Sequence, residues 1–366
     1  STVYALPTDG QVTAGDASIS TNAAKDTMNI DQKTSKVAID WKGFDIAKQE
    51  TVNFNQPSSS AIALNRVVGN NASEIYGHLN ANGQVFLINQ NGILFGKGAE
   101  VNVGGLVATT HNISNEEFMN SKGSYTFAGD SAKAVKNAGD IKAEGGLVAL
   151  LAADVSNEGT VATTQGTSAL AAGKNMTIDY ESDGKINLVV NKAVANAKAL
   201  NAGTIKADGG YVVMTARDAN ETLNTVVNNT GVIEAKSIKN INGTIYLDGG
   251  DQGVDEVGGT IDAAGDATGE TGGSVTVKGQ YTDVHSGTSL KASGDKGGGF
   301  IETSGKALLI GDGVDIDTSS AHGAIGEWLI DPMNLTIKAV ASDTTAFLND
   351  TYTGTKTNSV LSVKTL

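Results

Sequence analysis

Short runs that alternate apolar and polar residues recur along the chain, and a clear copy is Asn-Ala-Gly-Asp-Ile-Lys-Ala at residues 137–143. In an extended strand, Ile141 and Ala143 share one face, while Asp140 and Lys142 share the other. No helical period competes with this alternation, and Asn and Gly supply turns between the runs. Further copies, the last two looser, stand at residues 157–163, 201–207, 229–235, 258–263 and 286–292.

The spacing of these copies indicates a solenoid. Gly139 and Gly159 are 20 positions apart, and a second series of glycines repeats every 28 positions, at Gly203, Gly231, Gly259 and Gly287. Units of this length, each a turn and a short strand, cannot bury an apolar face alone, so they stack. The sequence therefore predicts an all-β fold, a parallel β-helix with strands about 4.8 Å apart and with ladders of repeated Asn side chains.

The first part of the chain lacks the repeat and predicts a cap. Trp41, Phe44 and Phe54 are concentrated in a chain that is only 5% aromatic, which suits the sealing of an open apolar end of the solenoid. We therefore expect a β cap over about residues 1–64. Its short strands are expected at residues 11–13, 17–20, 27–30 and 36–40.

Other segments interrupt the repeat. Residues 114–117, Ser-Asn-Glu-Glu, fit a capping box and predict a short helical turn. Residues 120–135 predict a hairpin or loop that leaves the solenoid, and the Ala-rich residues 192–200 predict a brief helix. We expect one domain over residues 1–366, with the cap followed by motif-rich first coils at 65–115, later coils at 116–340 and a continuation at 341–366 into a longer protein.

Composition and charge limit the classes of function that are possible. The net charge is −14, and Arg66 and Arg217 are the only arginines, so no basic cluster is present to neutralise nucleic-acid phosphates. The absence of Cys fits passage through an oxidising compartment before folding. The sequence contains no run of about 20 apolar residues, so no membrane-spanning helix is predicted. The four histidines stand outside metal-binding motifs, so no metal or cofactor is expected.

The acidic residues raise an enzymatic alternative. Asp312, Asp315 and Asp317 form the densest acidic set, and the last two share a strand face. Polysaccharide cleavage or cation binding requires carboxylates that lie close together in this way. A solvated outer strand face explains the same residues. The acidic and histidine motifs of polygalacturonase-like enzymes are absent, so we expect no catalytic residue.

The most specific stretch is residues 83–96, in which two apolar runs flank a polar turn. The turn is Asn89-Gln90-Asn91-Gly92, and both Asn and Gly tolerate the positive φ that a tight corner needs.

Three blocks, including this turn, resemble the secretion domain of two-partner-secretion exoproteins (TpsA proteins) of the filamentous-haemagglutinin type. They are residues 6–15, residues 65–110, and residues 300–305 together with 327–332. The third block is most similar to the high-molecular-weight-adhesin branch. One departure is Gln90, which stands where the family has Pro in Asn-Pro-Asn-Gly, so the turn loses a fixed φ.

The resemblance implies a right-handed parallel β-helix with an N-terminal β cap and extra-helical hairpins. It also implies a targeting function. A cognate outer-membrane TpsB-type transporter with POTRA domains recognises the domain in the periplasm after Sec export, and the chain crosses unfolded and starts folding at the cell surface. The motif residues expected to act, by recognition or by shaping the first coils, are Asn65, Arg66, Asn82, Gln84, Asn89, Gln90, Asn91 and Gly92.

Two other functions stay open. The domain is expected to be a secreted monomer without nucleic-acid partners, and its exposed ladder faces offer an adhesive or polysaccharide-binding surface. Host-cell or matrix glycans or exopolysaccharide are expected as partners through the full-length protein. A polysaccharide-degrading β-helix is the remaining alternative.

Overall fold

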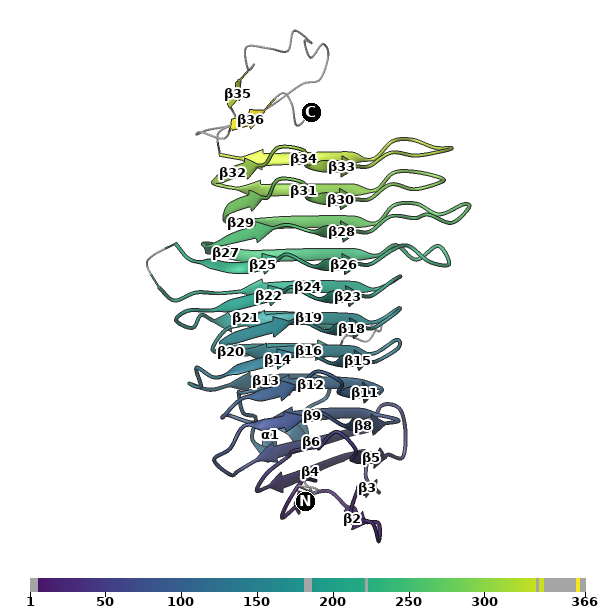
Figure 1. Cartoon of the computed structure of the whole chain (residues 1–366), viewed down its shortest axis with the longest axis vertical. Coiled ribbons are helices and arrows are strands. Elements are labelled where there is room, and N and C mark those ends of the chain that lie inside the picture. Colours follow the sequence, from purple (N-terminus) through teal and green to yellow (C-terminus); the bar gives the residue numbers. More distant parts are fainter. Residues whose placement is uncertain (1–5, 181–185, 221–222, 334–335, 339–359, 363–366) are drawn as a thin grey trace.

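The computed structural model describes residues 6–180, 186–220, 223–333, 336–338 and 360–362. The chain winds into a tall stack of coils with the N-terminal end at one extremity (Figure 1). In the described residues, short parallel strands build a sheet of 12 strands and a sheet of 21 strands that covers two faces of the stack. The predicted parallel β-helix is therefore confirmed.

The 12-stranded sheet takes one strand from each coil. In stacking order its strands are β2 (Ala17–Thr21), β3 (Thr27–Gln32), β5 (Thr51–Asn55), β8 (His78–Ala81), β11 (Glu100–Asn102), β15 (Asp140–Lys142), β18 (Thr160–Ala162), β23 (Thr204–Lys206), β26 (Val232–Glu234), β28 (Thr260–Asp262), β30 (Ser289–Lys291) and β33 (Asp315–Asp317).

The 21-stranded sheet takes the other strands of each coil. One of its stacks contains β4 (Lys36–Trp41), β6 (Ile62–Val67), β9 (Gln84–Ile88), β12 (Gly105–Thr109), β16 (Leu147–Ala152), β19 (Thr167–Ala172), β24 (Tyr211–Ala216), β27 (Thr244–Val257), β29 (Ser274–Val284), β31 (Phe300–Gly305) and β34 (Glu327–Pro332). Its remaining strands are β1 (Gln11–Ala14), β7 (Ser73–Ile75), β10 (Ile93–Phe95), β14 (Ala134–Asn137), β17 (Asp154–Asn157), β22 (Lys198–Asn201), β25 (Thr225–Asn229), β32 (Ala307–Ile310), β35 (Thr336–Lys338) and β36 (Val360–Ser362).

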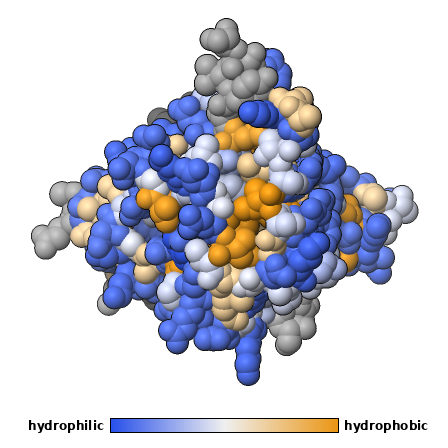
Figure 2. Space-filling model, turned by 90° about the horizontal axis from the view of Figure 1, so that it is seen from below, coloured by the Kyte–Doolittle hydropathy of each residue, from blue (hydrophilic) through white to orange (hydrophobic). Residues whose placement is uncertain are grey.

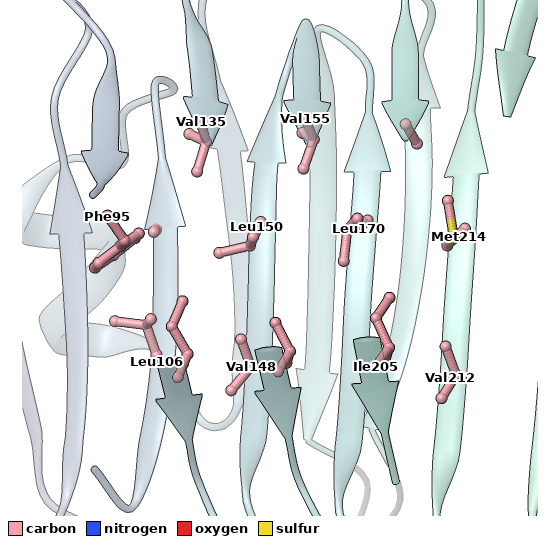
Figure 3. Close-up of a cluster of buried hydrophobic side chains, with 14 of the residues drawn as sticks. Phe95, Leu106, Val135, Val148, Leu150, Val155, Leu170, Ile205, Val212 and Met214 are labelled. Carbon is pink, nitrogen blue, oxygen red and sulfur yellow. The ribbon is translucent and has the colours of Figure 1, made fainter. Parts of the chain in front are cut away.

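The interior is a ladder of aliphatic side chains in register from coil to coil. Leu150, Leu170 and Met214 occupy one row of successive strands, and all three are fully buried. Val135 and Val155 form a second row on the neighbouring face, pointing into the same interior (Figure 3). Each inward side chain is therefore covered by its neighbours above and below, so a coil is stable only within the stack.

The repeated glycines bring successive coils close together. A Cβ on Gly159 would lie 2.1 Å from the carbonyl oxygen of Gly139, and one on Gly203 would lie 2.2 Å from that of Gly159. Any side chain at these corners would push the coils apart. This close approach explains why the repeat keeps Gly at the same place in each unit.

The N-terminal end has antiparallel pairing, as expected of a cap. β1 pairs antiparallel with β4, and β2 pairs antiparallel with β3, whereas β3–β5 and β4–β6 are already parallel. Seen end-on from below, hydrophobic residues gather near the centre of this end within a mostly hydrophilic periphery (Figure 2). Leu6, Val12, Ala17 and Ile19 are partly buried against the core here.

An extra-helical unit covers one side of the early coils. α1 (Asn115–Asn120) begins at the capping box of Ser114 and Glu117 that the sequence predicts. β13 (Ser124–Ala128), β20 (Asn175–Tyr180) and β21 (Ile186–Lys192) form an antiparallel sheet of three strands. Phe86 points outward from β9 and packs edge-on against Tyr125 at 5.2 Å between ring centroids. Residues 120–133 therefore leave the solenoid, as predicted, whereas Ala134 and Val135, at the end of the predicted segment, already belong to β14 of the 21-stranded sheet.

The prediction of a brief helix at residues 192–200 is wrong. Residues 198–201 form β22, in which Ala199 is 1% exposed and Asn201 is fully buried. Packing into the stack outweighs the weak helical preference of an Ala-rich segment. The predicted continuation at 341–366 lies outside the described residues apart from β36, and the predicted division at residues 64 and 115 stays a prediction.

A ladder of buried Asn side chains connects the coils, as predicted. The Nδ2 of Asn137 donates to the Oδ1 of Asn157, Asn157 donates to Asn201, and Asn201 donates to Asn229, each over 2.8 Å. All four residues are at most 1% exposed. Each bond is thus shielded from competing water.

We expect Asn157→Ala to lower the free energy of unfolding by about 3 kcal/mol, because it removes the side-chain hydrogen bonds that Asn157 makes with the buried amides of Asn137 and Asn201. The urea midpoint of the purified domain measures this loss. Asn53→Ala is the matched control. Asn53 bonds to Asn29 and Asn80 over 3.0 Å in a partly buried ladder, where water replaces the lost bonds. Equal losses in the two variants would contradict the importance of burial.

Candidate functional site

The predicted turn forms the corner between β9 and β10. The side chain of Asn89 is fully buried, and its Nδ2 donates to the carbonyl oxygen of Asn71 and to the Oγ of Ser73, each over 3.0 Å. Its Oδ1 accepts the backbone N–H of Asn91 over 2.9 Å. Gly92 has a φ of 109°, the left-handed region that the sequence predicted for this turn.

The corner also binds the loop of the preceding coil. The Nδ2 of Asn91 donates to the carbonyl oxygen of Gly69 over 2.9 Å. Gln90 differs from its neighbours because its side chain is exposed, and only its carbonyl oxygen is held, by the Oγ of Ser131. Asn89 and Asn91 therefore fasten one coil to the next, while Gln90 faces outward.

Asn65 and Arg66 lie next to each other on β6 and point to opposite sides. Asn65 is fully buried and accepts the indole N–H of Trp41 over 3.0 Å. Its Nδ2 donates to the carbonyl oxygen of Ala63 over 3.1 Å. Asn65 thus satisfies the polar atom of the largest aromatic residue under the cap, and it has no exposed surface for a partner.

Arg66 ties the cap to the extra-helical unit. Its guanidinium forms an ion pair with Asp40 at 2.9 Å and donates to the Oδ1 atoms of Asn112 and Asn115 over 2.9 Å each. A further N–H donates to the carbonyl oxygen of Ile113 over 2.6 Å. The sequence did not indicate these partners, because Asn112 and Asn115 are more than 45 residues away and belong to no repeat.

Asn82 and Gln84 hold the opposite corner of the same coil. Asn82 accepts from the backbone N–H of Gln56 over 2.7 Å and donates to its carbonyl oxygen over 2.8 Å, as a paired strand would. The Oε1 of Gln84 accepts the hydroxyl of Tyr180 over 2.7 Å. Tyr180 comes from β20, so this bond fastens the extra-helical sheet to the first coils.

The eight predicted residues therefore lie on two corners rather than at one point. Arg66 and Gln90 line a shared hollow of about 240 Å³, together with Val68, which is 58% exposed, and Thr110. Asn82 and Gln84 lie at the other corner. In the residues that the structure describes, no cluster of three or more His, Asp or Glu could hold a metal ion, and no helix is long and apolar enough to cross a membrane.

The comparison with known families identifies the chain. A family model for the TPS (two-partner secretion) secretion domain matches residues 4–268, which include both corners, the cap and the extra-helical unit. The chain belongs to the TPS secretion domain family. The predicted membership is thereby confirmed.

Relatives of this secretion domain are known in Haemophilus influenzae. A heme/hemopexin-binding protein of strain Rd is 37% identical over 254 residues, which are 67% of this chain and 27% of that protein. A second heme/hemopexin-binding protein of this species is 33% identical over 247 residues, 61% of this chain and 26% of that protein. The chain thus spans about a quarter of the length of the curated relatives it matches.

A solved structure supports the same fold. The crystal structure of the HMW1 secretion domain from Haemophilus influenzae superposes with a TM-score of 0.70 and 28% identity, and the match covers 89% of this chain and 100% of that one. The secretion domain described here therefore shares the β-helix fold of the HMW1 secretion domain.

His111 is a buried residue of the secretion domain that the sequence placed in no motif. It is fully buried beside the Arg66 hollow, and its Nε2 lies 2.6 Å from the carbonyl oxygen of Gly173. Its Nδ1 has no hydrogen-bond partner within the described part of the chain. Burial lowers the pKa of His111, although the carbonyl oxygen of Gly173 and the charge of Asp130 act in the opposite direction. The neutral ring, with the proton on Nε2, fits this environment.

We expect this histidine to make the domain less stable as the pH falls below about 6.5. The unfolded chain protonates His111 there more readily than the folded domain does, because burial lowers the pKa of the folded imidazole, so the unfolded state binds more protons and the free energy of unfolding falls with the pH. Urea midpoints of the wild type and of His111→Gln, whose amide keeps a donor for Gly173, should differ more at pH 7 than at pH 5. Parallel pH profiles would contradict this role. The other histidines are present in both proteins, so their contributions to the pH dependence cancel in the difference.

Proposed function

We propose that this secretion domain directs a large exoprotein to a cognate outer-membrane TpsB-type transporter with POTRA domains, and that it starts β-helix folding at the cell surface after Sec export. The match of the family model over residues 4–268 carries this proposal. We assign the domain no catalytic residue and expect it to act as a monomer.

The proposal gives the motif residues a folding role after passage through the transporter. Asn65, Asn89 and Asn91 all make side-chain hydrogen bonds within the domain. A partner that meets the folded domain cannot reach the buried pair Asn65 and Asn89. Closing these corners aligns the first coils, and each later coil then adds to a preformed edge. Such stepwise addition favours outward movement of the chain without ATP.

The full-length protein is expected to carry its ligand-binding activity beyond this domain. Its relatives are named for binding heme and hemopexin, and their matched segments are about a quarter of their length. We propose that the complete exoprotein is a cell-surface binding protein of this kind or an adhesin. The domain described here supplies its export.

Co-expression tests the export function. The chain behind a Sec signal peptide is produced in a Gram-negative host, with and without its cognate TpsB-type transporter, and the chain in the medium is quantified. We expect release only with the transporter, and retention in the periplasm without it. Equal release in both strains, or no release in either, would contradict the proposal. Periplasmic maltose-binding protein serves as the leakage control.

A further inference from the structure

A large hollow on the surface lies far from the motif corners, where β27 and β29 bend from one face of the solenoid to the next. It measures about 990 Å³ and spans five successive coils, those of β24, β27, β29, β31 and β34. We call it the corner groove. Its charged lining comes mainly from Arg217, Asp248, Lys278, Glu302, Lys306 and Asp331.

The stacking aligns these side chains along the solenoid axis. Asp248, Lys278, Ser304 and Asp331 occupy one register position of β27, β29, β31 and β34. Parallel strands are spaced about 4.8 Å apart, so the groove presents a new polar side chain at that interval. A ligand that lies along the axis therefore meets an equivalent position in each coil.

The floor of the groove is formed by glycine. Gly250 and Gly279 are paired in register just after the charged row, with Gly249 as an extra residue in β27, and Gly305 follows Ser304 in the next coil. A Cβ on Gly279 would lie 2.9 Å from the carbonyl oxygen of Tyr281, and one on Gly305 would lie 3.0 Å from that of Ala307. The bend thus excludes side chains, and the charged residues stand as walls beside a bare backbone.

One wall of the groove is held rigidly. Arg217 pairs with the carboxylate of Asp248 at 2.8 Å and donates to the Asp248 carbonyl oxygen over 3.0 Å. The Nζ of Lys278 lies 5.2 Å from the ring centroid of Tyr246, an arrangement that stabilises its charge. These groups are ordered before any ligand arrives, which reduces the entropy lost on binding.

Other polar groups in the groove are available to form hydrogen bonds with a ligand. Lys306 and Asp331 are exposed, and Glu302, which accepts the hydroxyl of Ser304 over 2.7 Å, keeps a second carboxylate oxygen. Gln280 also lines the groove, and its buried Oε1 has no hydrogen-bond partner among the residues that the structure describes. Donors and acceptors thus alternate over a short distance, and Pro332 and Met333 add an apolar rim.

We propose that the corner groove binds a neutral oligosaccharide laid along the solenoid axis. Sugar hydroxyls both donate and accept hydrogen bonds, as this alternating lining requires, and a pyranose unit is close in length to the strand spacing of about 4.8 Å. Carboxylates outnumber cations in the lining, so a polyanion is repelled. The activity is separate from export, because the groove shares no residue with the motif corners.

Titration calorimetry with defined neutral oligosaccharides tests this site. Maltohexaose, cellohexaose, mannohexaose and chitohexaose are titrated into the purified domain, and at least one is expected to bind in the submillimolar range. Glu302→Ala with Asp331→Ala is expected to weaken that binding by about tenfold or more, since two charged hydrogen-bond acceptors are lost. Lys142→Ala with Glu144→Ala, which removes an exposed ion pair at 3.3 Å on another face, is the matched control and should bind as the wild type.

Several outcomes would overturn the site. These are no heat from any hexasaccharide at millimolar concentration, unchanged binding by the groove variant, or equal weakening by the control. Binding of a lysine-rich peptide with no hexasaccharide bound would instead assign the groove to a protein partner. Urea midpoints of both variants verify that the fold is kept. Both variants should also be exported like the wild type, so a failure of this site leaves the export proposal standing.

Discussion

Replacing Asn89 with alanine is expected to lower the free energy of unfolding by about 3 kcal/mol and to abolish release through the transporter. The substitution leaves the carbonyl oxygen of Asn71, the hydroxyl of Ser73 and the N–H of Asn91 without the partner that they have in the buried corner. Each orphaned buried group costs about 1–3 kcal/mol. The urea midpoint of the purified domain and the amount of chain in the medium measure the two effects.

Gln90→Ala is the matched control in the same turn. The Gln90 side chain is exposed, and its only bond in the structure is made by its carbonyl oxygen, which alanine keeps. We therefore expect an unchanged urea midpoint and normal release. If Asn89→Ala blocked release of a domain with a wild-type midpoint, the transporter would read this residue directly in the unfolded chain. If Gln90→Ala alone blocked release, the folded corner would be the recognition surface.

The repeat made the fold predictable because a solenoid uses the same residue for the same purpose in each coil. Ile141 was expected to face inward, and it lies in register with Val161 and Ile205, all of them buried. Asn157 was expected in a ladder for the same reason. Once the inward residues of one repeat are identified, the inward residues of the equivalent strands in the other coils follow. This holds even where a single strand shows little alternation of its own.

The motif corners were less predictable, because their partners do not repeat. The positive φ of Gly92 follows from residue type alone. By contrast, the contacts of Arg66 with Asn112 and of Gln84 with Tyr180 join residues 46 and 96 positions apart. They exist only because the extra-helical unit folds back over the first coils. Nothing in the local sequence of either partner indicates such a contact.

The corner groove was not predictable for a further reason. Its walls are polar residues on the outer faces of successive strands, and no sequence motif is common to their positions. The groove arises because β27 and β29 continue around a bend where glycines exclude side chains. Asp315 and Asp317, the acidic set that the sequence did single out, lie on β33, and Asp317 accepts the N–H of Ser319 over 2.9 Å.

Trp41→Ala is expected to have the largest effect on stability, about 3–5 kcal/mol. Trp41 is fully buried under the cap, with its ring edge-on to Phe44 at 5.6 Å between centroids, and Gly10 packs so closely on it that a Cβ there would lie 2.4 Å from the indole. The truncation leaves a cavity and also leaves the Oδ1 of Asn65 without its donor. Urea denaturation measures the loss.

Refolding kinetics extend this experiment to the order of assembly. If the capped end nucleates the stack, Trp41→Ala slows refolding, because it removes contacts already made in the transition state. Trp328→Ala is the matched variant at the opposite end, where the indole is only partly buried and donates to the Oγ1 of Thr303 over 3.1 Å. It should mainly accelerate unfolding. A larger slowing of refolding by Trp328→Ala would place the nucleus in the later coils, and the capped end would then not be where folding starts at the cell surface.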